Sequence, residues 1–424
     1  MQTGKTNSSK NIENLLDYLF KLNRHGIKLG LEHTIDLLSH IGNPQDDFQS
    51  IHIAGTNGKG STCSMISSIL IKAGYKVGMY SSPHLISFNE RIRVNNKSIT
   101  NKEIALFLET RKNYIDQWKS TFFEVTTAMA FDHFAKCNVD IAIIETGLGG
   151  RLDSTNTLKP LITGITSISL DHRNLLGENI LQIAKEKGGI IKNEIPLVLY
   201  PNREKIKSVL TKIAEKLNVK PIEIDIPQNI SFSEKGTSFQ YNKFEYTTPL
   251  VGAFQAVNAI MAITIVKLFD NDISEKVIQD GLTFTSWPGR FQRMNKNLPI
   301  YYDVAHNAES IKSVLEQTKI IFKEKPLGLF VLKGNKELDL ISNVIKNNFY
   351  KLFVSGGKQL GLMEGFELGA KLEMQDVSNF KINNDFDSAL NELIVLVKKT
   401  RKPALILGSH YIAKPIFDKF GFYN

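Results

Sequence analysis

Glycines surround a lysine in the segment Gly55 to Ser61, which reads Gly-Thr-Asn-Gly-Lys-Gly-Ser. Glycines let consecutive backbone N–H groups turn toward an anion, and a neighbouring lysine supplies a positive charge for a phosphate. The spacing before Lys59 is shorter than in the common phosphate-loop pattern, so a plain glycine turn between a strand and a helix is the alternative. We predict a cradle for a nucleoside triphosphate, formed by Gly55, Thr56, Asn57, Gly58, Lys59, Gly60 and Ser61.

Carboxylate and imidazole side chains follow two other apolar runs. Glu145 ends the run at 139–144, and Asp171 and His172 follow the run at 161–170. If both runs are parallel strands, these side chains lie at the carboxyl edge of a sheet, where open α/β sheets bind ligands. Such groups beside a triphosphate suit Mg²⁺, which protein and phosphate then hold together. The alternative is that Asp171 caps a helix and His172 packs in the core.

Two further polar features have open interpretations. Lys187 stands at the end of a helix predicted for 178–187, where its spacing alone makes it a partner of the helix dipole. The segment Leu85 to Arg93 combines large apolar residues with an asparagine, a glutamate and two arginines. It is either a substrate loop or a surface helix, and the spacing favours the helix.

The elements that would position these groups alternate between strands and helices. The apolar residues Ile51, Ile53 and Ala54 precede the glycine loop, and apolar residues at helical spacing follow it. We expect strands at 75–80, 139–144, 161–170 and 196–200, helices within 11–40 and at 101–119, 122–136, 178–187, 253–269 and 273–283, and an antiparallel meander at 229–248. This order predicts an α/β fold, with a mostly parallel sheet and a small antiparallel sheet in an N-terminal P-loop ATPase domain.

A second α/β domain is expected after the segment Ser286 to Gln292, which breaks the periodicity. Strands are expected at 299–304, 327–332, 350–355 and 403–408, and helices near 309–322, 338–347, 360–371, 385–399 and 412–420. This alternation predicts a smaller, Rossmann-like C-terminal domain. We therefore predict a nucleotide-binding domain at 1–293 and a second domain at 294–424.

The composition excludes several classes of protein. The formal charge of +9 comes without a block of basic residues, so attraction of anionic small substrates, or solvated lysines alone, explains it better than nucleic-acid binding. Cys63 and Cys137 have no paired spacing, which argues against a disulfide framework or a zinc site, and we expect Cys63 in the core. The polar start and the absence of a long apolar run predict a cytoplasmic protein without a membrane span.

Several motifs follow one another in an order that extends over nearly the whole chain. Beside the glycine loop they are Ser82-Pro-His-Leu85, Phe88-Asn-Glu-Arg-Ile92, Glu145 to Asp153, Leu170-Asp-His172, Glu186-Lys187, Gly252 to Asn258, Trp287-Pro-Gly-Arg290, Asp303 to Asn307 and Gly408-Ser409. In this order they resemble the folylpolyglutamate synthase and dihydrofolate synthase family, within the wider Mur ligase superfamily. The resemblance implies an ATP-dependent acid–amino-acid ligase, in which ATP converts a carboxylate into an acyl phosphate that the amine of glutamate attacks.

The resemblance also implies that 1–293 is an ATP-binding domain of the central Mur ligase type and 294–424 a glutamate-ligase domain, and it implies ligands and residue roles. Ser82, Glu145 and His172 are similar to Mg²⁺ ligands, and Lys187 matches a lysine that is carbamylated in relatives and would then bind a second Mg²⁺. A monovalent cation is a further implied ligand. The resemblance implies catalytic roles for Lys59, His172, Lys187, Arg290 and His306, and nucleotide contacts by Asn258, Arg290 and Asp303. It further implies that Phe123, Arg151 and Asp153 contact the folate and that His306 and Ser409 contact the glutamate.

The implied substrates are ATP, L-glutamate and either dihydropteroate or a reduced folate, and retention of Arg151 and Asp153 favours both activities. We expect a monomer that binds neither nucleic acid nor a membrane. His410 stands where the family has an apolar residue. The alternatives are a peptidoglycan-precursor Mur ligase, which the segments after Ser82 and Phe88 argue against, a nucleotide-binding regulator without ligase activity, and a nucleic-acid binder.

Overall fold

The computed structural model describes residues 3–26, 30–334 and 337–422. Contacts divide the chain into two units, the first with Met1–Ile168, Leu176–Ile226 and Asn258–Leu282, the second with Ser169–Leu175, Pro227–Val257 and Thr283–Asn424. The domain boundary at 293 stays a prediction. Within the stretch 11–40, which we predicted to be helical, residues 27–29 lie outside the described residues.

The first unit is built on an eight-stranded sheet of order β4-β3-β2-β5-β1-β6-β7-β8. Its strands are β4 (Lys97–Ser98), β3 (Ile92–Val94), β2 (Val77–Tyr80), β5 (Ile141–Glu145), β1 (Gln49–Ala54), β6 (Ile162–Ile165), β7 (Leu197–Leu199) and β8 (Ile222–Glu223). From β2 to β8 neighbouring strands run parallel, and β3 and β4 add an antiparallel edge. Residues 50–54 of β1 and all residues of β5 and β6 are buried, as expected of parallel strands covered on both faces.

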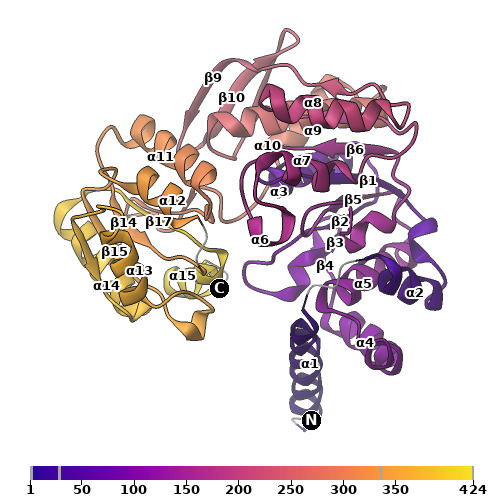
Figure 1. Ribbon diagram of the computed structural model, residues 1–424, viewed down its shortest axis with the longest axis horizontal. Coiled ribbons are helices and arrows are strands. Elements are labelled where there is room, and N and C mark those ends of the chain that lie inside the picture. The colour runs from indigo at the N-terminus through magenta and orange to yellow at the C-terminus, as the bar shows by residue number, and fades with distance from the viewer. Residues whose placement is uncertain (1–2, 27–29, 335–336, 423–424) are drawn as a thin grey trace. The chain divides into compact units, whose positions relative to one another are not determined.

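Helices cover the two faces of this sheet (Figure 1). The helices in these parts of the chain are α1 (Thr3–Lys21), α2 (Glu32–His40), α3 (Lys59–Lys72), α4 (Asn101–Gln117), α5 (Phe122–Lys136), α7 (Ile180–Gly188), α8 (Glu204–Glu215), α9 (Ala253–Phe269) and α10 (Glu275–Thr283). Of these, α1 packs mainly on α4 and α5 instead of on the sheet. On one face, a Cβ at Gly78 of β2 would lie 2.9 Å from the Phe134 ring of α5. On the other, a Cβ at Gly164 of β6 would lie 2.8 Å from the Met261 methyl group of α9. Glycine on these strands therefore lets both helix layers approach closely.

The second unit contains two sheets. The strands β9 (Gln228–Ser233), β10 (Gly236–Tyr241) and β11 (Phe244–Thr248) form the predicted antiparallel meander. A six-stranded sheet has the order β12-β13-β17-β14-β15-β16, parallel except at β12. Its strands are β12 (Gln292–Arg293), β13 (Ile300–Tyr302), β14 (Leu327–Phe330), β15 (Lys351–Val354), β16 (Phe380–Ile382) and β17 (Ala404–Leu407). Since β13, β17 and β14 are parallel neighbours, the segments after them meet at one edge of the sheet.

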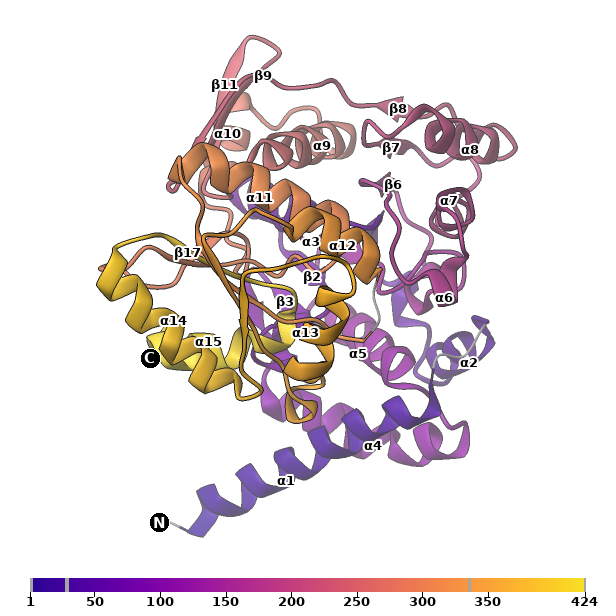
Figure 2. The ribbon, with the colours of Figure 1, turned by 60° about the vertical axis from the view of Figure 1, so that its left-hand side comes forward.

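Helices also pack on this second sheet. They are α11 (Ala308–Phe322), α12 (Leu338–Ile345), α13 (Gly365–Glu373), α14 (Phe386–Thr400) and α15 (Ala413–Phe420). A separate short helix, α6 (Arg173–Leu176), comes earlier in the chain. Figure 2 shows α11 and α12 side by side. Their buried residues Ile311, Val314 and Ile341 form one apolar core with Phe330 of β14 and Leu405 of β17. The predicted α/β fold with two mostly parallel sheets and one small antiparallel sheet is confirmed.

The segment Leu85 to Arg93 is not the surface helix that its spacing favoured. A 3-10 helix, η3 (Phe88–Arg91), is followed directly by β3, which pairs with β2. The Glu90 carboxylate accepts hydrogen bonds from the backbone N–H groups of Leu85, Ile86 and Ser87, at 2.9, 3.0 and 2.8 Å. The Glu90 side chain thus satisfies the backbone N–H groups of a tight loop. The spacing of apolar and polar residues cannot indicate such a role.

Two expectations from the composition can be compared with the fold. Cys63 is fully buried in α3, so its predicted core position is confirmed. None of the described helices is both long enough and apolar enough to cross a membrane.

Candidate active site

The glycine loop joins β1 to α3, as the sequence predicts. Gly55 has φ 148° and Gly58 has φ 90°, in the region that side chains rarely adopt. A Cβ at Gly55 would lie 1.7 Å from Thr166 Oγ1, and a Cβ at Gly58 would lie 2.6 Å from Asn258 Oδ1. Both glycines are therefore required, because the loop adopts positive φ angles where it also packs tightly. Asn258, predicted as a nucleotide contact, lies against this loop.

Residues after β6 hold the loop in place. The Thr56 N–H group donates to the Ser167 carbonyl at 2.7 Å, and Ser167 Oγ donates to the Asn57 carbonyl at 3.2 Å. The predicted strand at 161–170 is wrong in its length, because β6 ends at Ile165 and the next residues bind the loop instead of extending the sheet. Sequence reasoning missed Thr166 and Ser167, although hydroxyl side chains inside an apolar run were the available signal.

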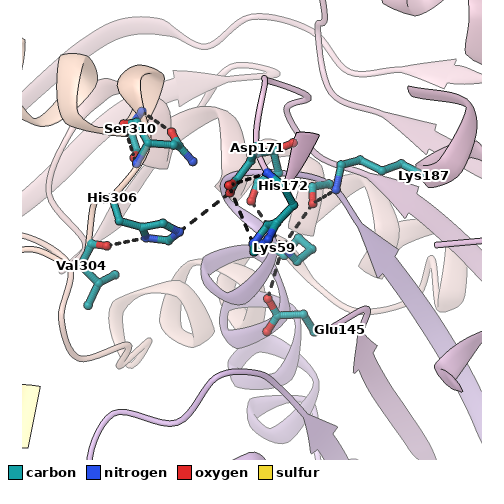
Figure 3. A network of polar contacts seen from close by, with 11 residues as sticks. Lys59, Glu145, Asp171, His172, Lys187, Val304, His306 and Ser310 are labelled. Atoms are coloured by element: carbon teal, nitrogen blue, oxygen red, sulfur yellow. Dashed lines mark hydrogen bonds and ion pairs between the residues drawn. The ribbon is translucent and has the colours of Figure 1, made fainter. Parts of the chain in front are cut away.

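Two lysine ammonium groups reach the same carbonyl oxygen of the loop (Figure 3). Lys59 Nζ donates to the carbonyl oxygens of Gly55 at 3.1 Å and Thr56 at 3.3 Å. Lys187 Nζ, from the last turn of α7, donates to the Gly55 carbonyl at 2.6 Å, and Lys187 is 4% exposed. With the amino end of α3, two positive charges converge on the loop, which is the arrangement that binds a multiply charged anion.

A carboxylate completes the loop on the neighbouring strand. Glu145, the last residue of β5, is 4% exposed, and its Oε1 lies 3.9 Å from Lys59 Nζ. The Ser82 N–H group, just after β2, donates to Glu145 Oε2 at 3.3 Å. Because β2, β5 and β1 are parallel neighbours, their carboxyl ends bring Ser82, Glu145 and the loop together. The predicted metal ligands Ser82 and Glu145 are therefore adjacent.

These two residues fit the chemistry of Mg²⁺. The ion prefers oxygen ligands and is usually held by one or two carboxylates, with phosphates and water supplying the rest. Ser82 and Glu145 offer a hydroxyl and a carboxylate beside the anion loop. Among residues 3–26, 30–334 and 337–422, no group of three or more His, Cys, Asp or Glu side chains could hold a metal ion. A Mg²⁺ site that takes some of its ligands from a bound phosphate needs fewer protein ligands, so it agrees with that finding.

Asp171 in the second unit lies between two imidazole rings (Figure 3). Its Oδ1 is 3.8 Å from His172 Nε2, and its Oδ2 is 3.9 Å from His306 Nε2. His306 Nδ1 is 2.8 Å from the Val304 carbonyl, and because a carbonyl can only accept, Nδ1 carries the proton of this bond. The structure thus joins His172 to His306, a pairing that the sequence did not indicate.

Asp303 organises the segment that carries Arg290. Its Oδ2 accepts from the Phe291 N–H group at 2.8 Å, and its Oδ1 accepts from the Ala305 N–H group at 2.7 Å. Burial raises the pKa of the Asp303 carboxyl, while the nearby positive charge of Arg290 opposes that shift. The Val304 N–H group also donates to the Gly289 carbonyl at 3.0 Å, so the residues around Arg290 are tied to the end of β13.

Ser409 follows β17, the strand beside β13. Its Oγ accepts from the Tyr411 N–H group at 3.1 Å, and its carbonyl accepts from the Tyr302 hydroxyl at 2.9 Å. The ring centroids of His306 and His410 lie 6.5 Å apart. The structure therefore brings the two predicted glutamate contacts, His306 and Ser409, to one edge of the second sheet and adds His410 beside them.

The predicted folate contacts Phe123, Arg151 and Asp153 surround the loop after β5. A Cβ at Gly147 would lie 2.2 Å from Phe123 Cζ, so the Phe123 ring packs directly on the loop. Asp153 is buried, which raises the pKa of its carboxyl. Its oxygens accept from the Leu148 N–H group at 2.7 Å and from the Thr155 N–H group at 3.1 Å. These carboxylate oxygens therefore already stabilise the loop.

The chain is similar to known proteins over most of its length. A family model described as the Mur ligase middle domain matches residues 53–266. The chain is 32% identical over 422 residues to a dihydrofolate synthase/folylpolyglutamate synthase of Bacillus subtilis, covering 93% of this chain and 95% of that protein. The structure resembles a Mycobacterium tuberculosis folylpolyglutamate synthase complexed with ADP and AMPPCP, with a TM-score of 0.89 and 27% identity over 97% of this chain and 99% of the other.

A second solved structure supports the same relationship. Escherichia coli FolC in complex with DHPP and ADP matches with a TM-score of 0.82 and 27% identity, covering 96% of this chain and 98% of the other. The family predicted from the order of the motifs is confirmed. The chain belongs to the Mur ligase family and, within it, to the dihydrofolate synthases and folylpolyglutamate synthases.

Proposed function

We propose that this protein is an ATP-dependent ligase that joins L-glutamate to the carboxylate of dihydropteroate or of a reduced folate. The observation that carries the proposal is the loop from Gly55 to Ser61, on which Lys59 and Lys187 converge beside Glu145. Relatives of this chain are folylpolyglutamate and dihydrofolate synthases, and two of them were solved with ADP bound. The first step of such a reaction is phosphoryl transfer from ATP, and a triphosphate cradle is the part of the site that would bind the ATP.

The reaction follows from the chemistry of a carboxylate, which is a poor electrophile. Transfer of the γ-phosphoryl group of ATP to a carboxylate oxygen forms an acyl phosphate and releases ADP. The amine of glutamate attacks the acyl carbon and loses a proton, the carbon–oxygen bond to phosphate breaks, and the amide remains. Lys59 and the backbone N–H groups of the loop hold the β- and γ-phosphates, where they stabilise the charge that moves with the phosphoryl group.

Several residues have proposed roles around these steps. Glu145 and Ser82 would hold Mg²⁺, which would supply positive charge against the phosphate oxygens. His172 is proposed as a further ligand. Lys187 is also proposed to be carbamylated; the anionic carbamate would then replace the ammonium group that donates to the Gly55 carbonyl, and it would hold a second Mg²⁺. Asn258, Arg290 and Asp303 are proposed as nucleotide contacts. Arg151 and Asp153 lie on the loop proposed to face the folate, and the Phe123 ring of α5 packs on that loop.

His306 and Ser409 are proposed to bind the incoming glutamate. Since His306 Nδ1 carries the proton of its bond to Val304, its Nε2 is the ring atom that can accept a proton from the attacking amine. A monovalent cation, a monomeric state, a cytoplasmic location and the absence of nucleic-acid partners stay predictions.

The proposal is tested by measuring ADP release by the purified protein with ATP, Mg²⁺ and L-glutamate, with dihydropteroate and tetrahydrofolate as separate acceptors. We expect glutamate-dependent ADP release with at least one acceptor, and a product that mass spectrometry identifies as the acceptor carrying one added glutamyl residue. ADP release with a UDP-muramoyl acceptor alone would instead indicate a peptidoglycan-precursor ligase. Nucleotide binding without glutamate-dependent ADP release with any acceptor would indicate a regulator.

A further inference from the structure

The Arg151 side chain is bound to helix α7. Its Nε and Nη2 atoms donate to the same oxygen of Glu186, Oε1, at 3.1 and 2.9 Å. The Arg151 backbone N–H group donates to the Glu186 carbonyl at 2.7 Å. Both the side chain and the main chain of Arg151 therefore hold the loop after β5 against the last turn of α7.

The neighbouring residues make this contact close. A Cβ at Gly150 would lie 2.9 Å from the carbonyl oxygens of both Glu186 and Lys187, and a Cβ at Gly189 would lie 2.3 Å from the Arg151 Cβ. Asn156 Nδ2 donates to the carbonyl oxygens of Arg151 and Gly189, each at 3.0 Å. We call these contacts between 150–156 and 186–189 the loop–helix clamp.

The clamp connects two parts of the candidate active site. The loop that contains Arg151 begins just after Glu145, at the carboxyl end of β5. The residue after Glu186 is Lys187, whose buried ammonium group donates to the Gly55 carbonyl at 2.6 Å. Helix α7 has 9 residues, so a few contacts at its last turn determine where Lys187 lies. A displacement of about 1 Å in such a site costs about 100-fold in rate.

The exposure of the pair indicates which effect to expect from breaking it. The side chains of Arg151 and Glu186 are 56% and 25% exposed. Ion pairs at such positions stabilise a fold by about 0 to 1 kcal/mol, because water screens them. Loss of this pair should therefore lower the free energy of unfolding by at most about 1 kcal/mol. Its main effect should be a displacement of the last turn of α7, which carries Lys187.

We propose that Arg151 is a positioning residue, which acts through Glu186 to hold Lys187 against the phosphate loop. This role rests on the proposed ligase function, and it replaces direct contact with the folate as the main task of Arg151. The bond geometry matters as well as the charge, since two N–H groups of one planar guanidinium reach one oxygen.

The experiment compares four variants of the full chain with the wild type: Arg151→Gln, Arg151→Lys, Glu186→Gln and the double variant Arg151→Gln/Glu186→Gln. We expect each glutamine variant to lower kcat about 10- to 100-fold, with the KM for the folate acceptor nearly unchanged. The double variant should be no worse than either single variant, because both remove the same contact. Arg151→Lys should recover part of kcat. Lys207→Gln breaks another half-exposed ion pair, with Glu223, and should have wild-type kinetics.

A second measurement uses the unliganded protein and does not depend on activity. Hydrogen exchange in peptides that cover 186–192 and 55–62 should be faster in Arg151→Gln and Glu186→Gln than in the wild type, with a small change in the urea midpoint. The proposal is overturned if Arg151→Gln raises the acceptor KM at wild-type kcat while Glu186→Gln behaves as the wild type. It is also overturned if exchange is unchanged in both variants. Inactivity of the wild type itself would refute the proposed ligase function, and the exchange data would still test the clamp.

Discussion

Substitution of Gly55 by alanine tests whether the geometry of the phosphate loop is required. The added Cβ meets two separate penalties. Gly55 has φ 148°, and an L side chain in the left-handed region costs about 1 to 2 kcal/mol. The Cβ would also lie 1.7 Å from Thr166 Oγ1, and overpacking of this kind costs about 1 to 3 kcal/mol. Gly55→Ala should therefore lower the free energy of unfolding by about 2 to 5 kcal/mol.

Gly42 provides the matched control. It has φ 91°, but nothing lies within 4 Å of the position of its Cβ. Gly42→Ala should therefore show the backbone penalty alone, about 1 to 2 kcal/mol, and should leave nucleotide affinity unchanged. Gly55→Ala should weaken binding of a non-hydrolysable ATP analogue as well, because the loop must move to accommodate the methyl group.

The two penalties at Gly55 can be separated by a double-mutant cycle with Thr166→Ala, measured by urea unfolding and by calorimetric titration with the ATP analogue. Thr166→Ala has its own cost, since Thr166 Oγ1 donates to the Ala54 carbonyl at 3.2 Å. In that background Gly55→Ala should cost about 1 kcal/mol less than in the wild type, because the contact with Oγ1 is removed. Part of the overpacking remains, since Thr166 Cβ would still lie 2.9 Å from the added Cβ. The reasoning is refuted if Gly55→Ala costs no more than Gly42→Ala, or if the cycle shows no coupling.

Three further predictions concern individual side chains. Lys59→Ala and Glu145→Ala should abolish ligation and leave the fold largely intact by circular dichroism, and full turnover by either variant would overturn the assignment of the site. Activity should depend on bicarbonate, and the Lys187 peptide should carry the added mass of a carbamyl group; absence of both counts against carbamylation. Burial lowers the pKa of His52 to about 3, so below about pH 6.5 the unfolded chain binds a proton that the folded chain does not. The free energy of unfolding should therefore fall by about 1.4 kcal/mol per pH unit from this group as the pH drops toward 3. The His52→Gln variant should show a correspondingly shallower pH dependence. Equal slopes for the variant and the wild type would show that burial of His52 does not cause the loss of stability at low pH.

Long, mostly apolar helices could be predicted from the sequence. The helices α5 and α9 have the predicted bounds, 122–136 and 253–269. Helix α5 begins with a capping box, in which Thr121 Oγ1 accepts from the Glu124 N–H group and the Glu124 side chain accepts from the Thr121 N–H group. Local signals of this kind need no tertiary contact, which is why the sequence alone indicates them.

The parts that could not be predicted depend on contacts between distant segments. Ser167 anchors the phosphate loop from a stretch that looked like a continuing strand, and it does so through residues more than a hundred positions away. Arg151 and Glu186 lie on different elements, so only the fold shows that they are paired. The same holds for Asp171, which joins His172 to His306.

The site itself was predicted in part because parallel strands deliver their carboxyl ends to one edge. That rule indicated that Glu145 lies at the same edge as the glycine loop, and the structure adds Ser82, whose N–H group donates to the Glu145 carboxylate. It could not indicate that Lys187 shares the Gly55 carbonyl with Lys59, because the length and direction of α7 determine that contact.

The central claim is that the loop from Gly55 to Ser61 activates a folate carboxylate for attack by glutamate. The most direct measurement incubates the protein with ATP, Mg²⁺ and an acceptor labelled with ¹⁸O in its carboxylate, with and without L-glutamate. Our account predicts transfer of one ¹⁸O atom to the released phosphate, together with an acceptor that has gained a glutamyl residue, and neither product with Lys59→Ala. Amide formation with unlabelled phosphate would contradict the acyl-phosphate route.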